Sequence, residues 1–105
     1  MLKINLEYRK GILFVRLKGE LTKNTYKLLN EHLLSIVKEQ GIKYIVFNLA
    51  RVDYIDKYGK YSLKSIINET KKNYGKSLIC NAKVKFDDRY KIIDNELMAF
   101  KTVKI

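Results

Sequence analysis

The sequence has no proline, a single cysteine and no long apolar run, and each absence excludes a class of protein. Without proline or a Gly/Ser-rich stretch there is no linker between domains, and 105 residues suffice for one core. The longest apolar runs span about five residues, whereas a membrane-spanning helix needs roughly 20. Cys80 alone can form no internal disulfide, which suits a reducing compartment. The charged N-terminus does not resemble a signal peptide. We therefore expect one domain over residues 1–105, cytoplasmic and without membrane contact.

Acidic residues are also scarce: the chain has 11 Asp and Glu but 22 Lys and Arg, which gives a formal net charge of +11. A basic domain of this size raises nucleic acid as a partner. However, the basic residues are scattered along the chain and comprise 18 lysines and only four arginines. Proteins that read bases and phosphates rely on the guanidinium fork of arginine. We interpret the charge mainly as a solvated surface, so that nucleic acid is a disfavoured partner.

The spacing of apolar residues predicts alternating strands and helices. Strands are expected at residues 2–8, 12–18, 43–49, 77–81 and 99–104, and helices at residues 24–40, 56–74 and 85–94. Thr22 or Asn24 could cap the first helix, and Gly41 could end it. The order β-β-α-β-α-β-α-β predicts an α/β fold. We expect a mixed, mostly parallel sheet of four to five strands, with an antiparallel N-terminal hairpin and helices packed on it.

Two loops of this fold are expected to lie at the same edge of the sheet. Right-handed crossovers bring the loops that follow parallel strands to one edge, and these loops are residues 19–24 and 50–56. In open sheets of this kind, ligands and partners meet the carboxyl ends of the strands. The segment GELTKN at 19–24 should therefore lie next to the helix that begins at Asp56.

The sequence offers no arrangement of residues typical of catalysis or metal binding. His32 is alone in a predicted helix, and Cys80 lies in an apolar strand, where thiols are usually inert. Neither a dinucleotide-binding glycine pattern nor a phosphate-binding loop is present. Asp53 and Asp56 are three residues apart, but Asp56 already has a structural task as a helix cap. We expect no enzymatic activity, no cofactor and no bound metal.

Gly59 occupies the first turn of the helix that begins at Asp56, where glycine costs roughly 1 kcal/mol relative to alanine. One explanation is close packing of this turn against neighbouring backbone. The other is that a bare turn lets a partner approach, and its free N–H groups would then also favour an anion. The flanking residues are basic or aromatic, namely Lys57, Tyr58, Lys60, Tyr61 and Lys64. Such a lysine row is either a solvated face or, because tyrosine is enriched in interfaces, a docking surface.

Three segments carry a joint pattern that is more specific than any single motif. They are GELTKNTYKLLNEHL at 19–33, IVFNLARVDYIDKYGKYSL at 45–63 and GKSL at 75–78. Together they resemble the STAS domain, a fold named for sulfate transporters and anti-sigma factor antagonists, over essentially the whole chain. In the antagonists, a partner kinase that is also an anti-sigma factor phosphorylates a serine directly before the glycine. Phosphate at that helix start blocks docking through repulsion and bulk.

The chain departs from this family at the phosphorylated position. The serine corresponds to Tyr58 and the residue before it to Lys57, while two acidic positions of the family hold Thr22 and Asn48. Gly19, Glu20, Asp56 and Gly59 match the family pattern. Because tyrosine is not a substrate of a serine-directed kinase, the resemblance implies that the usual switch is absent. Ser62 and Ser65 offer hydroxyls further along the helix, but at positions that do not match.

The resemblance implies a module that docks on an anti-sigma factor or a related kinase-type protein, through the 19–24 loop and the helix start at 56–64. The predicted contact residues are Gly19, Glu20, Thr22, Asp56, Lys57, Tyr58, Gly59, Lys60, Tyr61 and Lys64. An alternative is a module that binds a small ligand, such as an anion, nucleotide or lipid, near Lys57 and Gly59. Both a monomer and a weak dimer are compatible with these features.

Overall fold

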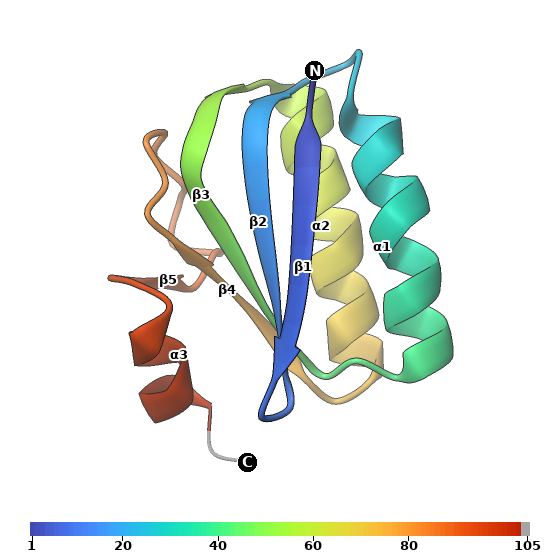
Figure 1. Ribbon diagram of the computed structural model, residues 1–105, viewed down its shortest axis with the longest axis vertical. Helices are drawn as coiled ribbons and strands as arrows, with labels where there is room; N and C mark the ends of the chain where they lie inside the picture. Colours follow the sequence, from blue (N-terminus) through green and yellow to red (C-terminus); the bar gives the residue numbers. More distant parts are fainter. Residues whose placement is uncertain (104–105) are drawn as a thin grey trace.

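Strands and helices follow each other along the chain in the computed structural model, which describes residues 1–103 (Figure 1). In order, they are β1 (Lys3–Arg9), β2 (Ile12–Leu21), α1 (Tyr26–Gln40), β3 (Tyr44–Ile55), α2 (Lys57–Lys72), β4 (Lys76–Cys80), β5 (Ile92–Ile93) and α3 (Leu97–Thr102). The sheet has the order β1-β2-β3-β4-β5. β1 pairs antiparallel with β2, and every other pair is parallel. The predicted α/β fold class, with its mixed sheet and N-terminal hairpin, is confirmed.

The helices are divided between the two faces of the sheet. Strand β2 alternates, so Leu13, Val15 and Leu17 join the apolar cluster under α1 and α2. Ile12 and Phe14 point to the other face, where α3 covers them with Ala99 and Val103. The predicted burial of β3 on both faces is also confirmed, because its neighbouring residues Ile45 and Val46 are both fully buried on opposite sides.

The last two elements differ from the prediction. Residues 85–94, expected as a helix, contain turns and the short strand β5 instead. The Asp87 carboxylate accepts hydrogen bonds from the backbone N–H and the guanidinium of Arg89, which closes a local turn that competes with a helix. Val84 and Phe86 pack on the core with the two-residue spacing of extended chain. The element order is therefore β-β-α-β-α-β-β-α.

The segment expected as a final strand, residues 99–104, forms most of α3 instead, and its last residue, Lys104, lies outside the described residues. Ala99 and Val103 are four residues apart and both are buried, as on one face of a helix. The Phe100 ring lies 5.6 Å from the Phe14 ring, measured between centroids. Short apolar runs do not distinguish a strand from a helix by periodicity, and burial on the sheet decides here.

Strands β2 and β3 extend beyond their predicted ends and carry a bulge. Arg16 pairs with Asn48 but Lys18 pairs with Arg51, so β3 holds one extra residue at this point. The Asn48 side-chain oxygen accepts the Ala50 N–H at 3.0 Å, which stabilises the bulge. Residues 50–55, expected as a loop, therefore continue the strand, and Asn48 lies in the middle of β3 rather than at its end.

The helix ends follow the expected chemistry with one exception. Gly41 ends α1 in the left-handed conformation with a φ of 62°, and Asp56 caps α2, as predicted. The cap position of α1 is Thr25, not Thr22 or Asn24. The Thr25 hydroxyl donates to the Glu20 carbonyl at 2.7 Å and accepts the Thr22 N–H at 2.9 Å, which folds this loop into a tight turn. Among residues 1–103, no helix combines the length and apolar character needed to cross a bilayer.

Candidate functional site

The end of β2 and the start of α2 lie side by side, which confirms that the two predicted loops meet at one edge of the sheet (Figure 1). Leu21 pairs with Ile55, and the Asp56 N–H donates to the Leu21 carbonyl at 3.2 Å. The Lys23 N–H donates to an Asp56 carboxylate oxygen at 2.9 Å. The 19–24 segment is thus fixed to the helix start by two hydrogen bonds, one donated by the Asp56 backbone N–H and one accepted by the Asp56 carboxylate.

Asp56 organises this junction with both carboxylate oxygens. Its Oδ1 accepts the Gly59 N–H at 2.9 Å as a helix cap, while its Oδ2 accepts the N–H of Lys23. Desolvation raises the pKa of this carboxyl, but the backbone donors, Gly59 first, together outweigh it and hold the pKa below its ordinary value. The carboxylate is therefore ionised at neutral pH, with its negative charge at the positive end of α2.

Close packing explains the glycine in the first turn of α2. Gly59 is buried, and a Cβ atom there would collide with the Leu21 carbonyl oxygen and with the Ile55 side chain. Of the two explanations that the sequence allowed, the structure supports packing of the turn against backbone. Gly59 lies beneath the exposed residues of this site and lets α2 approach the end of β2.

Tyr58, in the first turn of α2, is half-buried beside the first turn of α1. Its ring centroid lies 5.7 Å from that of Tyr26. The ammonium groups of Lys23 and Lys57 lie 5.8 and 5.5 Å from the centre of the same ring. Cations at such distances are attracted to an aromatic face. These contacts restrain Tyr58 within a mixed aromatic and basic surface.

A shallow hollow of about 460 Å³ lies over this ring, lined by Tyr26, Lys57, Tyr58 and Tyr61. We call these four residues, together with Lys23, the tyrosine–lysine surface. Tyr61 is its most protruding aromatic residue, with 63% of its surface exposed. Tyr26 was not among the predicted contact residues, although it lies in the first turn of the helix predicted at 24–40 and begins α1.

The other predicted residues occupy different surroundings. Glu20 is exposed, while Thr22 is half-buried and its hydroxyl oxygen accepts the Asn24 N–H at 3.3 Å. The Lys60 ammonium lies 5.7 Å from the centre of the Phe86 ring, and Lys64 lines a separate hollow beside Arg89. Lys60 and Lys64 therefore lie toward the segment before β5, away from the tyrosine–lysine surface.

The two serines of α2 are less accessible than expected. Ser62 is fully buried, and its hydroxyl donates to the Asn30 side-chain oxygen at 2.6 Å. The expectation that Ser62 offers an available hydroxyl is therefore wrong, because its position faces α1. Ser65 is half-buried, and its hydroxyl donates to the Tyr61 carbonyl at 3.0 Å.

The groups that proteins most often use for nucleophilic or base chemistry lie outside this surface. Cys80 is fully buried, and burial, with a smaller contribution from Glu96, raises the pKa of its thiol to about 11. His32 is exposed on α1, and its Nδ1 lies 2.9 Å from the Leu28 carbonyl. Within residues 1–103, no three His, Cys, Asp or Glu side chains are grouped so that they could hold a metal ion.

Comparison with known proteins adds a family and a fold. The model of the STAS domain family matches residues 3–96. Among solved structures, the phosphorylated form of the Bacillus cell fate determinant SpoIIAA is similar with a TM-score of 0.79 and 17% identity, covering 97% of this chain and 100% of that one. Unphosphorylated SpoIIAA, an anti-sigma factor antagonist, gives 0.76 and 17%, covering 95% and 96%. An anti-sigma factor antagonist from Mycobacterium paratuberculosis gives 0.80 and 17%, covering 98% and 94%.

Proposed function

Since the chain belongs to the STAS domain family, we propose that it is a protein–protein interaction module that docks on an anti-sigma factor or a related kinase-type protein. It has the fold of anti-sigma factor antagonists. The observation that supports docking is the tyrosine–lysine surface, in which three tyrosines and two lysines gather where the 19–24 segment is tied to α2. The proposed action is reversible binding without a chemical step.

Two physical features suit this surface to a protein partner. Tyrosine supplies a large contact area with little conformational freedom to lose, and it is enriched in interface cores. Tyr58 is already held by Tyr26 and the two lysines, so less entropy is lost on binding. Lys23 and Lys57 at its margin favour an acidic surface on the partner.

We further propose that docking is not controlled by phosphorylation of a serine on this chain. Tyr58 stands at the switch position, and its hydroxyl projects further from the backbone than a serine hydroxyl would. Ser62, the nearest serine along α2, is buried against α1 and unavailable to a kinase. The interaction would therefore persist when ATP is present.

Small-ligand binding at the helix start is a weaker candidate. The Gly59 N–H, which could have received an anion, already donates to the Asp56 carboxylate. An incoming anion would meet that ionised group at close range, and like charges at short distance repel. Docking of a protein on the tyrosine–lysine surface does not require an anion to bind at the α2 N-terminus.

The direct test measures the affinity of this chain for the kinase-type anti-sigma factors encoded in its own genome, by titration calorimetry. Tyr61→Ala should weaken the complex about tenfold or more, as expected for a central aromatic contact. Tyr8→Ala is the matched control, because Tyr8 is 61% exposed against 63% for Tyr61 but lies on β1. Equal losses for the two variants, or the absence of any complex, would contradict the proposal.

The switch is tested by adding ATP to the complex and weighing the intact chain. We expect the complex to persist and the mass to stay unchanged. Tyr58→Ser should restore a residue that the kinase can phosphorylate, so that ATP then dissociates the variant complex. Phosphate on Tyr58 of the unaltered chain, or dissociation of the unaltered complex when ATP is added, would show that a switch operates.

A further inference from the structure

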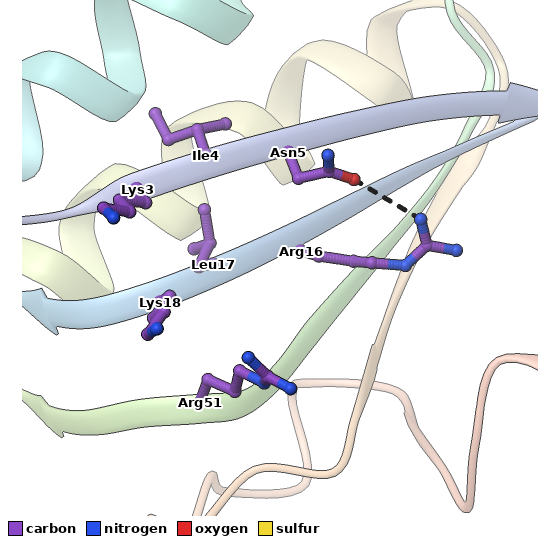
Figure 2. Close-up of a pocket in the computed structure, with 7 residues that line it drawn as sticks. All are labelled: Lys3, Ile4, Asn5, Arg16, Leu17, Lys18 and Arg51. Carbon is purple, nitrogen blue, oxygen red and sulfur yellow. Dashed lines mark hydrogen bonds between the residues drawn. The ribbon is translucent and has the colours of Figure 1, made fainter.

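The sheet face opposite α1 and α2 is only partly covered. Helix α3 packs over Ile12, Phe14 and Val46, near one end of the strands. Towards the other end, the same face presents polar and basic side chains from three adjacent strands (Figure 2). They come from β1 (Lys3, Asn5), β2 (Arg16, Lys18) and β3 (Arg51), and they line a hollow of about 500 Å³.

The bulge in β3 places Arg51 on this face. Without the extra residue, strand alternation from Asn48 would put position 50 opposite Lys18, whereas the register pairs Lys18 with Arg51. Val52 then enters the core with only 2% exposure, and Arg51 stays exposed. Figure 2 shows Lys18 on β2 and Arg51 on β3 next to each other at the hollow.

The cations of this hollow differ in whether a carboxylate neutralises them. Arg16 is engaged by Glu7 and Glu96, at 2.7 and 2.8 Å. Within residues 1–103, the side chains of Lys3, Lys18 and Arg51 form no ion pair. We call these three residues the open basic face. The uncovered part of the sheet therefore holds three neighbouring cations that no carboxylate of the described residues neutralises.

A second hollow of about 320 Å³ continues from the first and shares Lys3, Lys18 and Arg51 with it. It adds Lys83, whose ammonium lies 3.4 Å from the Asp53 carboxylate. The two hollows therefore adjoin each other, and none of the residues that line either one is aromatic.

We propose that the open basic face binds an acidic, extended peptide segment of a partner protein. Lys3, Lys18 and Arg51 are cross-strand neighbours, so their cations form a row across β1, β2 and β3. In an extended peptide every second side chain points the same way, so the alternate carboxylates of a peptide laid across these strands can meet the long side chains of this row. Nucleic acid fits less well, because sheet surfaces that bind single strands stack bases on aromatic side chains, which these hollows lack. This surface is separate from the tyrosine–lysine surface, since α1 and α2 pack on the opposite face of the sheet.

The experiment uses the full chain and a fluorescein-labelled ten-residue peptide of alternating Glu and Ser, followed by fluorescence anisotropy at low ionic strength. The Lys18→Gln/Arg51→Gln double variant should bind it roughly tenfold more weakly, as expected for two lost charge contacts. The matched control, Lys38→Gln/Lys71→Gln, removes the same charge from exposed positions on α1 and α2 and should change affinity less than about twofold. Circular dichroism checks that both variants fold.

Equal losses in the two double variants would overturn the proposal, because they would show attraction by net charge alone. Tighter binding of a thymidine oligonucleotide of equal charge, lost in Lys18→Gln/Arg51→Gln, would overturn it in favour of nucleic acid. The Tyr61→Ala variant should bind the acidic peptide normally. That result separates this surface from the proposed docking on an anti-sigma factor, so either proposal can fail while the other stands.

Discussion

The two faces of the sheet hold their helices in different ways. Under α1 and α2, one apolar cluster runs from Leu2 on the N-terminal side to Ile79 on β4. Under α3 the apolar cluster is smaller, and beside it lies a polar network. The Glu96 carboxylate, next to the first residue of α3, accepts two hydrogen bonds from Arg16, at 2.9 and 2.8 Å, and one from Asn48 at 2.8 Å.

The two helix layers therefore differ in which interactions hold them to the sheet. Burial of apolar surface fixes α1 and α2 and is insensitive to pH and salt over ordinary ranges. Except for Lys23, the proposed docking surface lies on these two helices, so apolar packing of the helices positions most of it. The attachment of α3 depends in part on ionised groups, and part of the sheet beside it remains open.

The largest effect should follow from a cavity on the helix-covered face. Ile66→Ala removes a fully buried side chain of α2 and should lower the free energy of unfolding by about 4 kcal/mol. Leu97→Ala, on α3, shortens a side chain that is 74% exposed and should change it by less than about 0.5 kcal/mol. Urea unfolding followed by circular dichroism measures both. Similar losses would show that the buried side chain of Ile66 stabilises the chain no more than an exposed side chain of α3 does.

A smaller but still large effect is expected at the junction of α2 and β2. Gly59→Ala forces a Cβ atom against the Leu21 carbonyl and should destabilise the chain by about 3 kcal/mol. Gly41→Ala meets no neighbouring atom and carries only the strain of its left-handed conformation, about 1 kcal/mol. The same unfolding measurement distinguishes them. A cost for Gly59→Ala no greater than that for Gly41→Ala would argue against close packing.

The polar network on the α3 side should contribute less and should depend on pH. Hydrogen bonds from Arg16 lower the pKa of Glu96 and outweigh the effect of its burial. Glu96→Gln should therefore lower the free energy of unfolding by about 1 kcal/mol at neutral pH. A carboxyl whose pKa is lower in the folded chain stabilises it above the ordinary value of 4.5, and this contribution disappears as the pH falls through the folded pKa.

The measurement is urea unfolding of both chains at neutral pH and at several pH values below 4.5. The difference between the unaltered chain and Glu96→Gln should shrink as the pH falls, because the carboxyl is then protonated in both states. A difference that stays constant across this range would mean that Glu96 acts through its shape and not through its charge.

The central part of the fold was predictable because its local signals agree with the long-range ones. The alternation in β1 and β2, the apolar run of β3 and the Asp56 cap each specify one structure. The C-terminal part was not predictable, because residues 82–103 have short apolar runs whose structure depends on where they pack. The burial of Val84 and Phe86 on one apolar cluster and of Ala99 on the other depends on long-range contacts that no local pattern displays.

The meeting of the 19–24 segment with the start of α2 was predictable, but the contacts around it were not. Right-handed crossovers were enough to bring the 19–24 loop to Asp56. The sequence could not indicate that Tyr26 would pack on Tyr58, or that Lys60 and Lys64 would lie toward the segment before β5. These outcomes depend on the rotation of α1 and α2 about their axes, which packing sets. The β3 bulge that places Arg51 on the outer face also has no signal in the sequence, where this part of the chain reads only as an apolar strand.

The central claim is that the tyrosine–lysine surface is where a partner protein docks. The most direct test is amide hydrogen exchange of this chain, alone and mixed with a kinase-type anti-sigma factor from its own genome, read by mass spectrometry. We predict slower exchange in residues 19–26 and 56–64 and unchanged exchange in β4 and α3. Protection confined to the opposite face of the sheet, or no protection at partner concentrations that saturate a complex, would contradict the account.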